Sequence, residues 1–167
     1  MSENWKKELR KIKKMTKKKV LEIRKREELL RDKYKEDAKR IMDLIYSQLK
    51  VVEEIFKEKG LLPKIRRYEN SIEMCCPFVV YGELRFLPSI SFHLLLTNEG
   101  YNVMVSYLMG GGGAVKLLRS IFGYEKIVIP SPVRIEDIQK EIKAFLQKRS
   151  QAIVHMDALY KTSERRF

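Results

Sequence analysis

The first 59 residues contain neither glycine nor proline, and this absence constrains the fold more than any other feature. Apolar residues recur there at three- and four-residue spacing, with fourteen steps over the 51 residues from Trp5 to Phe56, or 3.64 residues per step. This period is closer to that of a straight α-helix than to the 3.5 of a left-handed coiled coil. A helix is therefore predicted over residues 2–59, with Ser2 as its N-cap and Gly60 as its stop signal.

A single helix of this length would reach roughly 80 Å at 1.5 Å per residue, which exceeds the diameter of a domain of this size. Two positions of the apolar stripe, Thr16 and Glu27, are polar and are candidate places for a break, although neither residue demands one. The sequence leaves open whether residues 2–59 form one straight helix or two packed helices.

Positive charge is concentrated at the N-terminal end of the chain. The formal net charge of the 167 residues is +13, and residues 1–40 hold 17 Lys or Arg against 8 Asp or Glu, a net of +9. Such an asymmetry indicates a polyanionic partner, which is nucleic acid (DNA or RNA), an anionic membrane surface or an acidic protein. The plain alternative is that these charges form a solvated helix face. The high charge also fits a heat-adapted protein.

The favoured hypothesis is a non-enzymatic nucleic-acid-binding protein that contacts the phosphate backbone with little regard to sequence. Its candidate contacts are cations of the N-terminal segment and four cations nearer the C-terminus: Lys6, Lys7, Arg10, Lys11, Lys14, Lys17, Lys18, Arg66, Arg67, Lys116 and Arg119.

The two halves of the predicted helix differ. The apolar stripe over Leu30–Phe56 is wide enough to pack on a domain, whereas the stripe over Trp5–Ile23 is narrow and surrounded by lysines. The N-terminal half is therefore expected to be an arm that pairs with another helix or lies on a polyanion. An oligomer contact is predicted at Trp5, Leu9 and Ile12. The alternative function is a structural or adaptor subunit that oligomerises or docks a partner through this helix.

Residues 60–130 change to a period of two, which predicts an antiparallel sheet of three to four strands and a short helix. Strands are expected over Ile72–Val80, where Pro77 marks an edge strand or a bulge, and over Leu84–Leu87. The clearest hairpin joins SISFHLLLT and YNVMVSYLM through the turn Asn98-Glu99-Gly100. AVKLLRSIFG and KIVIP then predict a short helix and a short strand.

A C-terminal amphipathic helix is predicted over residues 131–162, with Ser131 and Pro132 as start signals and residues 163–167 as a frayed tail. The fold class is thus α+β, with a long basic N-terminal helix able to form a coiled coil. The order helix, three strands, helix resembles that of a double-stranded-RNA-binding domain. The basic, small-residue signature of that family's second helix is not matched by AVKLLRSIFG, which offers Lys116 and Arg119.

No motif indicates catalysis, a metal or a cofactor. Asp is absent between Leu44 and Glu136, and no GxSxG elbow occurs, so an enzyme is not expected. The adjacent cysteines Cys75 and Cys76 and the two histidines, His93 and His155, match no zinc spacing.

A glycine-rich stretch is the candidate phosphate loop, because backbone N–H groups before a helix attract anions; it comprises Gly110, Gly111, Gly112 and Gly113. It lacks the GxxxxGK pattern, and a flexible or close-packed loop is the favoured interpretation. No apolar run reaches the ~18–20 residues of a membrane span. A secretory leader is not recognised either. A cytoplasmic location is expected.

Overall fold

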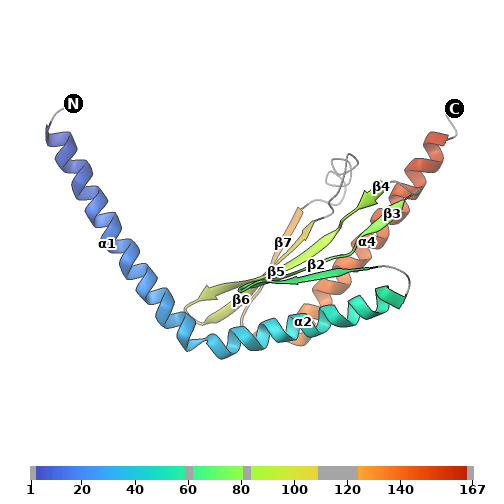
Figure 1. Cartoon of the computed structure of the whole chain (residues 1–167), viewed down its shortest axis with the longest axis horizontal. Helices are drawn as coiled ribbons and strands as arrows, with labels where there is room; N and C mark the ends of the chain where they lie inside the picture. Colours follow the sequence, from blue (N-terminus) through green and yellow to red (C-terminus); the bar gives the residue numbers. More distant parts are fainter. Residues whose placement is uncertain (1–2, 59–61, 81–83, 109–123, 165–167) are drawn as a thin grey trace.

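The computed structural model describes residues 3–58, 62–80, 84–108 and 124–164. Figure 1 shows a body made of α2, the strands and α4, from which α1 projects as an arm. The α+β class is confirmed, and the elements in chain order are α1 (Glu3–Lys33), α2 (Lys35–Glu58), β1 (Lys64–Arg67), β2 (Ser71–Cys75), β3 (Phe78–Val80), β4 (Leu84–Phe86), β5 (Ser89–Thr97), β6 (Gly100–Leu108), β7 (Tyr124–Ile129) and α4 (Ile135–Glu164).

The long N-terminal helix is divided in two at Tyr34, and not at Thr16 or Glu27. The chain bends sharply at this point (Figure 1). Backbone hydrogen bonds nevertheless run through the bend, since Tyr34 N donates to Leu30 O and Ala38 N donates to Tyr34 O, each at 3.0 Å. The bend therefore changes the direction of the helix without leaving these backbone groups unpaired.

Side chains hold the bend against the turn between β5 and β6. The Tyr34 hydroxyl donates to the backbone oxygen of Asn98 at 3.0 Å. The Arg26 guanidinium donates to the side-chain oxygen of the same Asn98, also at 3.0 Å. The direction of the arm is thus set by contacts with a turn more than sixty residues away in the sequence.

The main sheet has five antiparallel strands in the order β1-β2-β5-β6-β7, more than the three to four predicted. The additional strand is β1, which occupies one edge, and the predicted short strand, β7, occupies the other. The predicted hairpin is β5–β6, in which Thr97 pairs with Gly100 around the two-residue turn. Gly100 has φ +127°, a conformation that L side chains rarely adopt.

The strand predicted over Ile72–Val80 is interrupted at Pro77. β2 ends at Cys75, and β3 begins at Phe78 in a separate two-stranded ribbon with β4. Proline has no N–H to donate to a ladder, so the chain leaves the main sheet at this residue.

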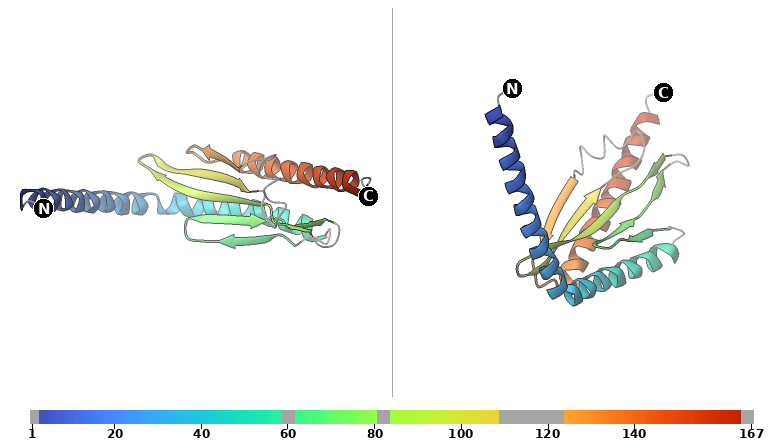
Figure 2. Two further views of the ribbon diagram at one scale, coloured as in Figure 1. Left: turned by 90° about the horizontal axis from the view of Figure 1, so that it is seen from above. Right: turned by 60° about the vertical axis from the view of Figure 1, so that its left-hand side comes forward.

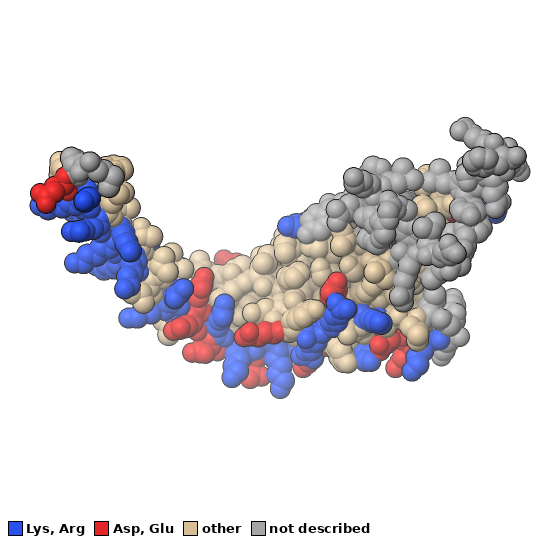
Figure 3. Space-filling model, turned by 45° about the horizontal axis from the view of Figure 1, so that its top comes forward, with Lys and Arg blue, Asp and Glu red and all other residues tan. Residues whose placement is uncertain are grey.

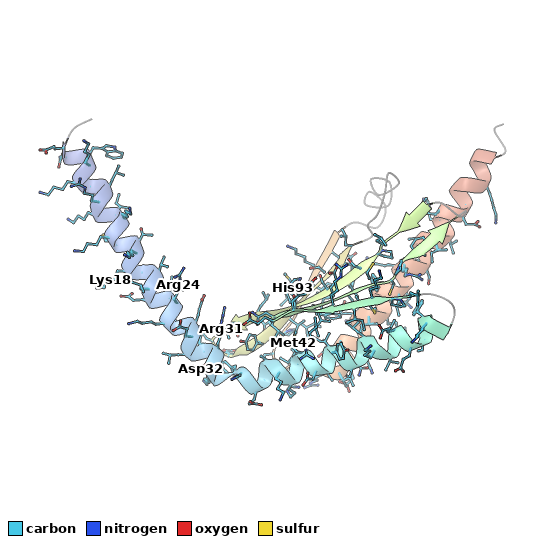
Figure 4. All side chains as sticks on the ribbon, viewed as in Figure 1. Lys18, Arg24, Arg31, Asp32, Met42 and His93 are labelled. Carbon is cyan, nitrogen blue, oxygen red and sulfur yellow. The ribbon has the colours of Figure 1, made fainter. Side chains whose placement is uncertain are left out.

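One face of the sheet packs on α2 and α4. Figure 4 shows Met42 of α2 pointing toward the sheet, while His93 of β5 lies on the opposite face. Alternate residues of the central strands are buried against apolar residues of both helices, among them Ile72, Met74, Ile90, Phe92, Val103, Val105, Ile41, Ile45, Leu49, Ile138, Ile142 and Phe145.

The last helix begins at Ile135, four residues later than the predicted start at Ser131. Ser131 N donates to the side-chain oxygen of Asn102 at 3.0 Å, which ties this segment to β6. Arg134 N donates to the carboxylate of Asp137 at 3.3 Å, a side-chain cap at the true start. Figure 2 shows that α1 and the C-terminal part of α4 leave opposite ends of the body.

Candidate nucleic-acid interface

α1 is exposed along its length, and none of its described residues is buried. At about 100° per residue, six of its apolar residues lie within about 60° of Trp5 on the helix circumference, whereas Met15, Leu21 and Leu29 lie outside this range. We call this set the inner stripe; it comprises Trp5, Leu9, Ile12, Val20, Ile23 and Leu30. The three residues predicted as an oligomer contact therefore share one face, and the side chain of Ile12 is 58% exposed.

The inner stripe lies on the side of α1 that faces the body. Arg26 and Tyr34, which contact the β5–β6 turn, are within about 60° of this stripe on the helix circumference. Figure 3 shows uncharged atoms on this side of the arm and Lys and Arg along the other side. The arm is amphipathic, with both of its faces open to solvent.

The seven cations predicted in the arm lie on the opposite side. All are within about 80° of Lys14 on the helix circumference. We call them the outer face; it comprises Lys6, Lys7, Arg10, Lys11, Lys14, Lys17 and Lys18. The only acid from Lys6 to Leu21 is Glu8, which lies about 120° from Lys14.

The outer face has shallow hollows between its side chains. One, of about 460 Å³, is lined by Lys11, Lys14, Lys17 and Lys18 with Met15 and Leu21. The lysine stems cover apolar surface here while their ammonium groups reach solvent. Figure 4 shows Lys18 on the side of the arm away from the body. Cations held apart on a rigid helix in this way can each contact a separate anionic group.

Two of the predicted cations of the body are described, and both lie away from the outer face. Arg66 and Arg67 are on the edge strand β1, where Arg66 pairs across the ladder with Glu73. Arg67 donates to the carboxylate of Asp43 at 2.8 Å, and its guanidinium lies 5.6 Å from the centre of the Tyr46 ring. Arg67 therefore helps to attach β1 to α2.

The structure does not describe the remaining candidates. Lys116, Arg119 and the glycines Gly110 to Gly113 lie outside the described residues. Among the described residues, no group of three or more His, Cys, Asp or Glu side chains could hold a metal ion. Burial raises the pKa of the Cys76 thiol to about 12, so this thiol is protonated at neutral pH.

Sequence reasoning missed Lys25 as a member of the outer face. Lys25 follows Lys18 by seven residues, which is two helical turns, and lies within about 20° of Lys14. The seven-residue spacing of Lys11, Lys18 and Lys25 was the available signal. With Lys25, the basic face extends over the first three quarters of α1.

No protein-family model matches this chain, and no curated protein or solved structure matches it either. Within the described part of the chain, no helix is long and apolar enough to cross a membrane.

Proposed function

We propose that this protein binds nucleic acid through the outer face of α1, by contacts with the phosphate backbone that do not depend on sequence. The observation that carries the proposal is the placement of seven cations on one exposed face of a helix that projects from the body. Nucleic-acid phosphates attract such a surface, and the release of condensed counterions favours binding.

The composition of the outer face favours backbone contacts over base recognition. Six of its seven residues are lysines, and Arg10 is the exception. Lysine is a flexible point charge, whereas the bidentate recognition of guanine edges is usually made by arginine. α1 is also long enough for an extended contact, because its 31 residues span about 46 Å.

Fluorescence anisotropy tests this proposal, with labelled duplex DNA, duplex RNA and single strands at about 50 and 200 mM salt. For six to ten phosphate contacts, we expect affinity to fall ~10³–10⁵-fold over this range. Replacing Lys11, Lys14 and Lys18 by Gln should reduce the slope of log K against log salt by about 2.7 on duplex DNA.

The matched control removes the same charge from the body, with Lys39, Lys57 and Lys140 replaced by Gln. These three side chains are exposed on α2 and α4, so their loss should leave the slope nearly unchanged. Equal effects of the two triple variants would overturn the assignment to the arm. The proposal also fails if the protein binds anionic vesicles but no nucleic acid at 50 mM salt, a concentration at which ~6–10 phosphate contacts bind strongly.

A second candidate function is that of a structural or adaptor subunit that associates through α1. The exposed inner stripe favours it, because exposed apolar side chains gathered on one face often mark an interaction site. The two functions use opposite faces of α1 and are compatible.

A further inference from the structure

A groove between α2 and α4 offers a second exposed apolar surface. It has a volume of about 710 Å³, and its ten lining residues all belong to these two helices. No residue of the sheet is among them, so the groove opens on the helical side of the body. Val52, Ile142 and Leu146 supply apolar lining, and Val51 beside them is 51% exposed.

The rim of this groove is mostly uncharged. It is lined by Gln48, Gln139, Gln147 and Gln151, and the Gln139 side-chain amide donates to the Gln48 side-chain oxygen at 2.9 Å. The apolar surface continues along α4 into a second hollow of about 520 Å³ that includes Val154 and Ala158. Amide rims and an apolar floor are suited to a helix that presents an apolar stripe.

The part of the inner stripe from Trp5 to Ile23 matches the groove in length. From Trp5 to Ile23 the stripe covers 18 residues, about 27 Å at 1.5 Å per residue. From Gln139 to Ala158 the two hollows follow α4 for 19 residues, about 28 Å. Trp5, Leu9 and Ile12 follow the three- and four-residue spacing by which helices anchor in grooves, and Val20 and Ile23 resume it after the polar Thr16.

Charge favours the groove over a second arm as the partner of the stripe. α1 carries 14 Lys or Arg and 6 Asp or Glu, a net of +8, so two paired arms would repel each other. By contrast, α2 carries 5 Lys or Arg and 6 Asp or Glu, a net of −1. α4 carries 5 of each and is neutral. An arm can dock on these helices without that repulsion.

The arm cannot reach the groove of its own chain in this structure. α1 bends toward the sheet side of the body, and its stripe faces the sheet rather than the helices α2 and α4 (Figures 1 and 3). We propose that the inner stripe of α1 docks in the α2–α4 groove of a second copy of this chain. The outer face stays exposed in this arrangement, and the docking does not depend on nucleic acid.

Disulfide trapping tests the pairing directly, in a Cys75→Ser background without nucleic acid. One preparation carries Ile12→Cys in the arm, and another carries Val51→Cys in the groove. Mixing the two under mild oxidation should give a cross-linked heterodimer. Cross-links only between two arm cysteines would overturn the proposal, since the arms would then pair with each other.

Sedimentation velocity gives the second readout. Ile12→Gln and Val51→Gln should each weaken self-association at least ~10-fold, as expected for a central apolar contact. Leu29→Gln and Val128→Gln are matched controls. Leu29 is 71% exposed and lies on α1 outside the inner stripe, and Val128 is 52% exposed and lies on the sheet. A wild-type monomer at all concentrations would contradict the proposed docking. The proposed nucleic-acid binding would still be tested by the anisotropy measurement, which does not depend on association.

Discussion

Among the described residues, Arg149 of α4 is the one buried cation, with 4% of its surface exposed. Its Nε donates to Cys76 O at 3.0 Å, and a terminal nitrogen donates to Pro77 O at 3.1 Å. The guanidinium lies 5.2 and 5.3 Å from the centres of the Phe56 and Phe78 rings. Burial lowers the pKa of Arg149, while the carbonyl oxygens and ring faces stabilise its charged form. Arg149 thereby joins α4 to the corner at which the chain leaves the main sheet.

Replacing Arg149 by Met tests this role, because methionine fills much of the same space but donates no hydrogen bond. Two carbonyl oxygens would lose their partner, so we expect the free energy of unfolding to fall by about 1–3 kcal/mol. Urea denaturation followed by circular dichroism measures it. Lys143→Met, at an exposed position of the same helix, should change it by less than about 0.5 kcal/mol. An unchanged or higher value for Arg149→Met would mean that desolvation of the guanidinium cancels its contacts.

The bend between α1 and α2 determines where the arm points, and two side-chain hydrogen bonds to Asn98 secure it. Removing them by Tyr34→Phe and Arg26→Gln should leave both helices formed, since the backbone hydrogen bonds at the bend remain. Each lost bond removes about 0.5–1.5 kcal/mol of preference for the observed direction. The distribution of distances between spin labels at Lys18→Cys and Lys140→Cys, in a Cys75→Ser background, should broaden.

The matched control for the bend is the pair Arg24→Gln and Tyr46→Phe. It makes the same chemical changes at two residues that, within the described part of the chain, form no hydrogen bond with the β5–β6 turn. A control distribution as broad as that of the double variant at the bend would show that Asn98 does not hold the arm.

The sequence was sufficient to predict features that depend on local spacing. The period of 3.64 predicted helix on both sides of Tyr34, and alternation around Asn98 predicted the β5–β6 hairpin. The bend could not be predicted, because it depends on contacts between residues 64 and 72 positions apart. The edge strand β1 was missed because KIRR has no apolar alternation. Its pairing with β2 and the ion pair between Arg67 and Asp43 depend on residues that are distant in the sequence.

The groove could not be predicted from the sequence either, because Gln48 and Gln139, which meet at its rim, are 91 positions apart. The inner stripe and the outer face, by contrast, follow from helical spacing alone. What the structure adds is their direction, with the apolar side of the arm toward the body and the basic side away from it. An assembly built through the stripe would therefore carry several outer faces, each open to a phosphate backbone.

This arrangement predicts different outcomes for substitutions on the two faces of α1. Ile12→Gln removes no charge, yet by dissociating the assembly it should lower affinity for a long duplex by up to ~10²–10⁴-fold, the range of avidity. It should also reduce the salt slope, because fewer arms contact each duplex. The triple replacement of Lys11, Lys14 and Lys18 by Gln should reduce the salt slope and leave the sedimentation coefficient unchanged.

Leu29→Gln is the control for both measurements, because Leu29 lies on α1 outside the inner stripe and contributes no charge. It should alter neither the sedimentation coefficient nor the salt slope. If Ile12→Gln dissociated the protein without weakening its binding to a long duplex, the arms of one assembly would not engage the same nucleic acid. Such a result would mean that each arm binds phosphates separately. Association through the inner stripe would then not contribute to binding through the outer face.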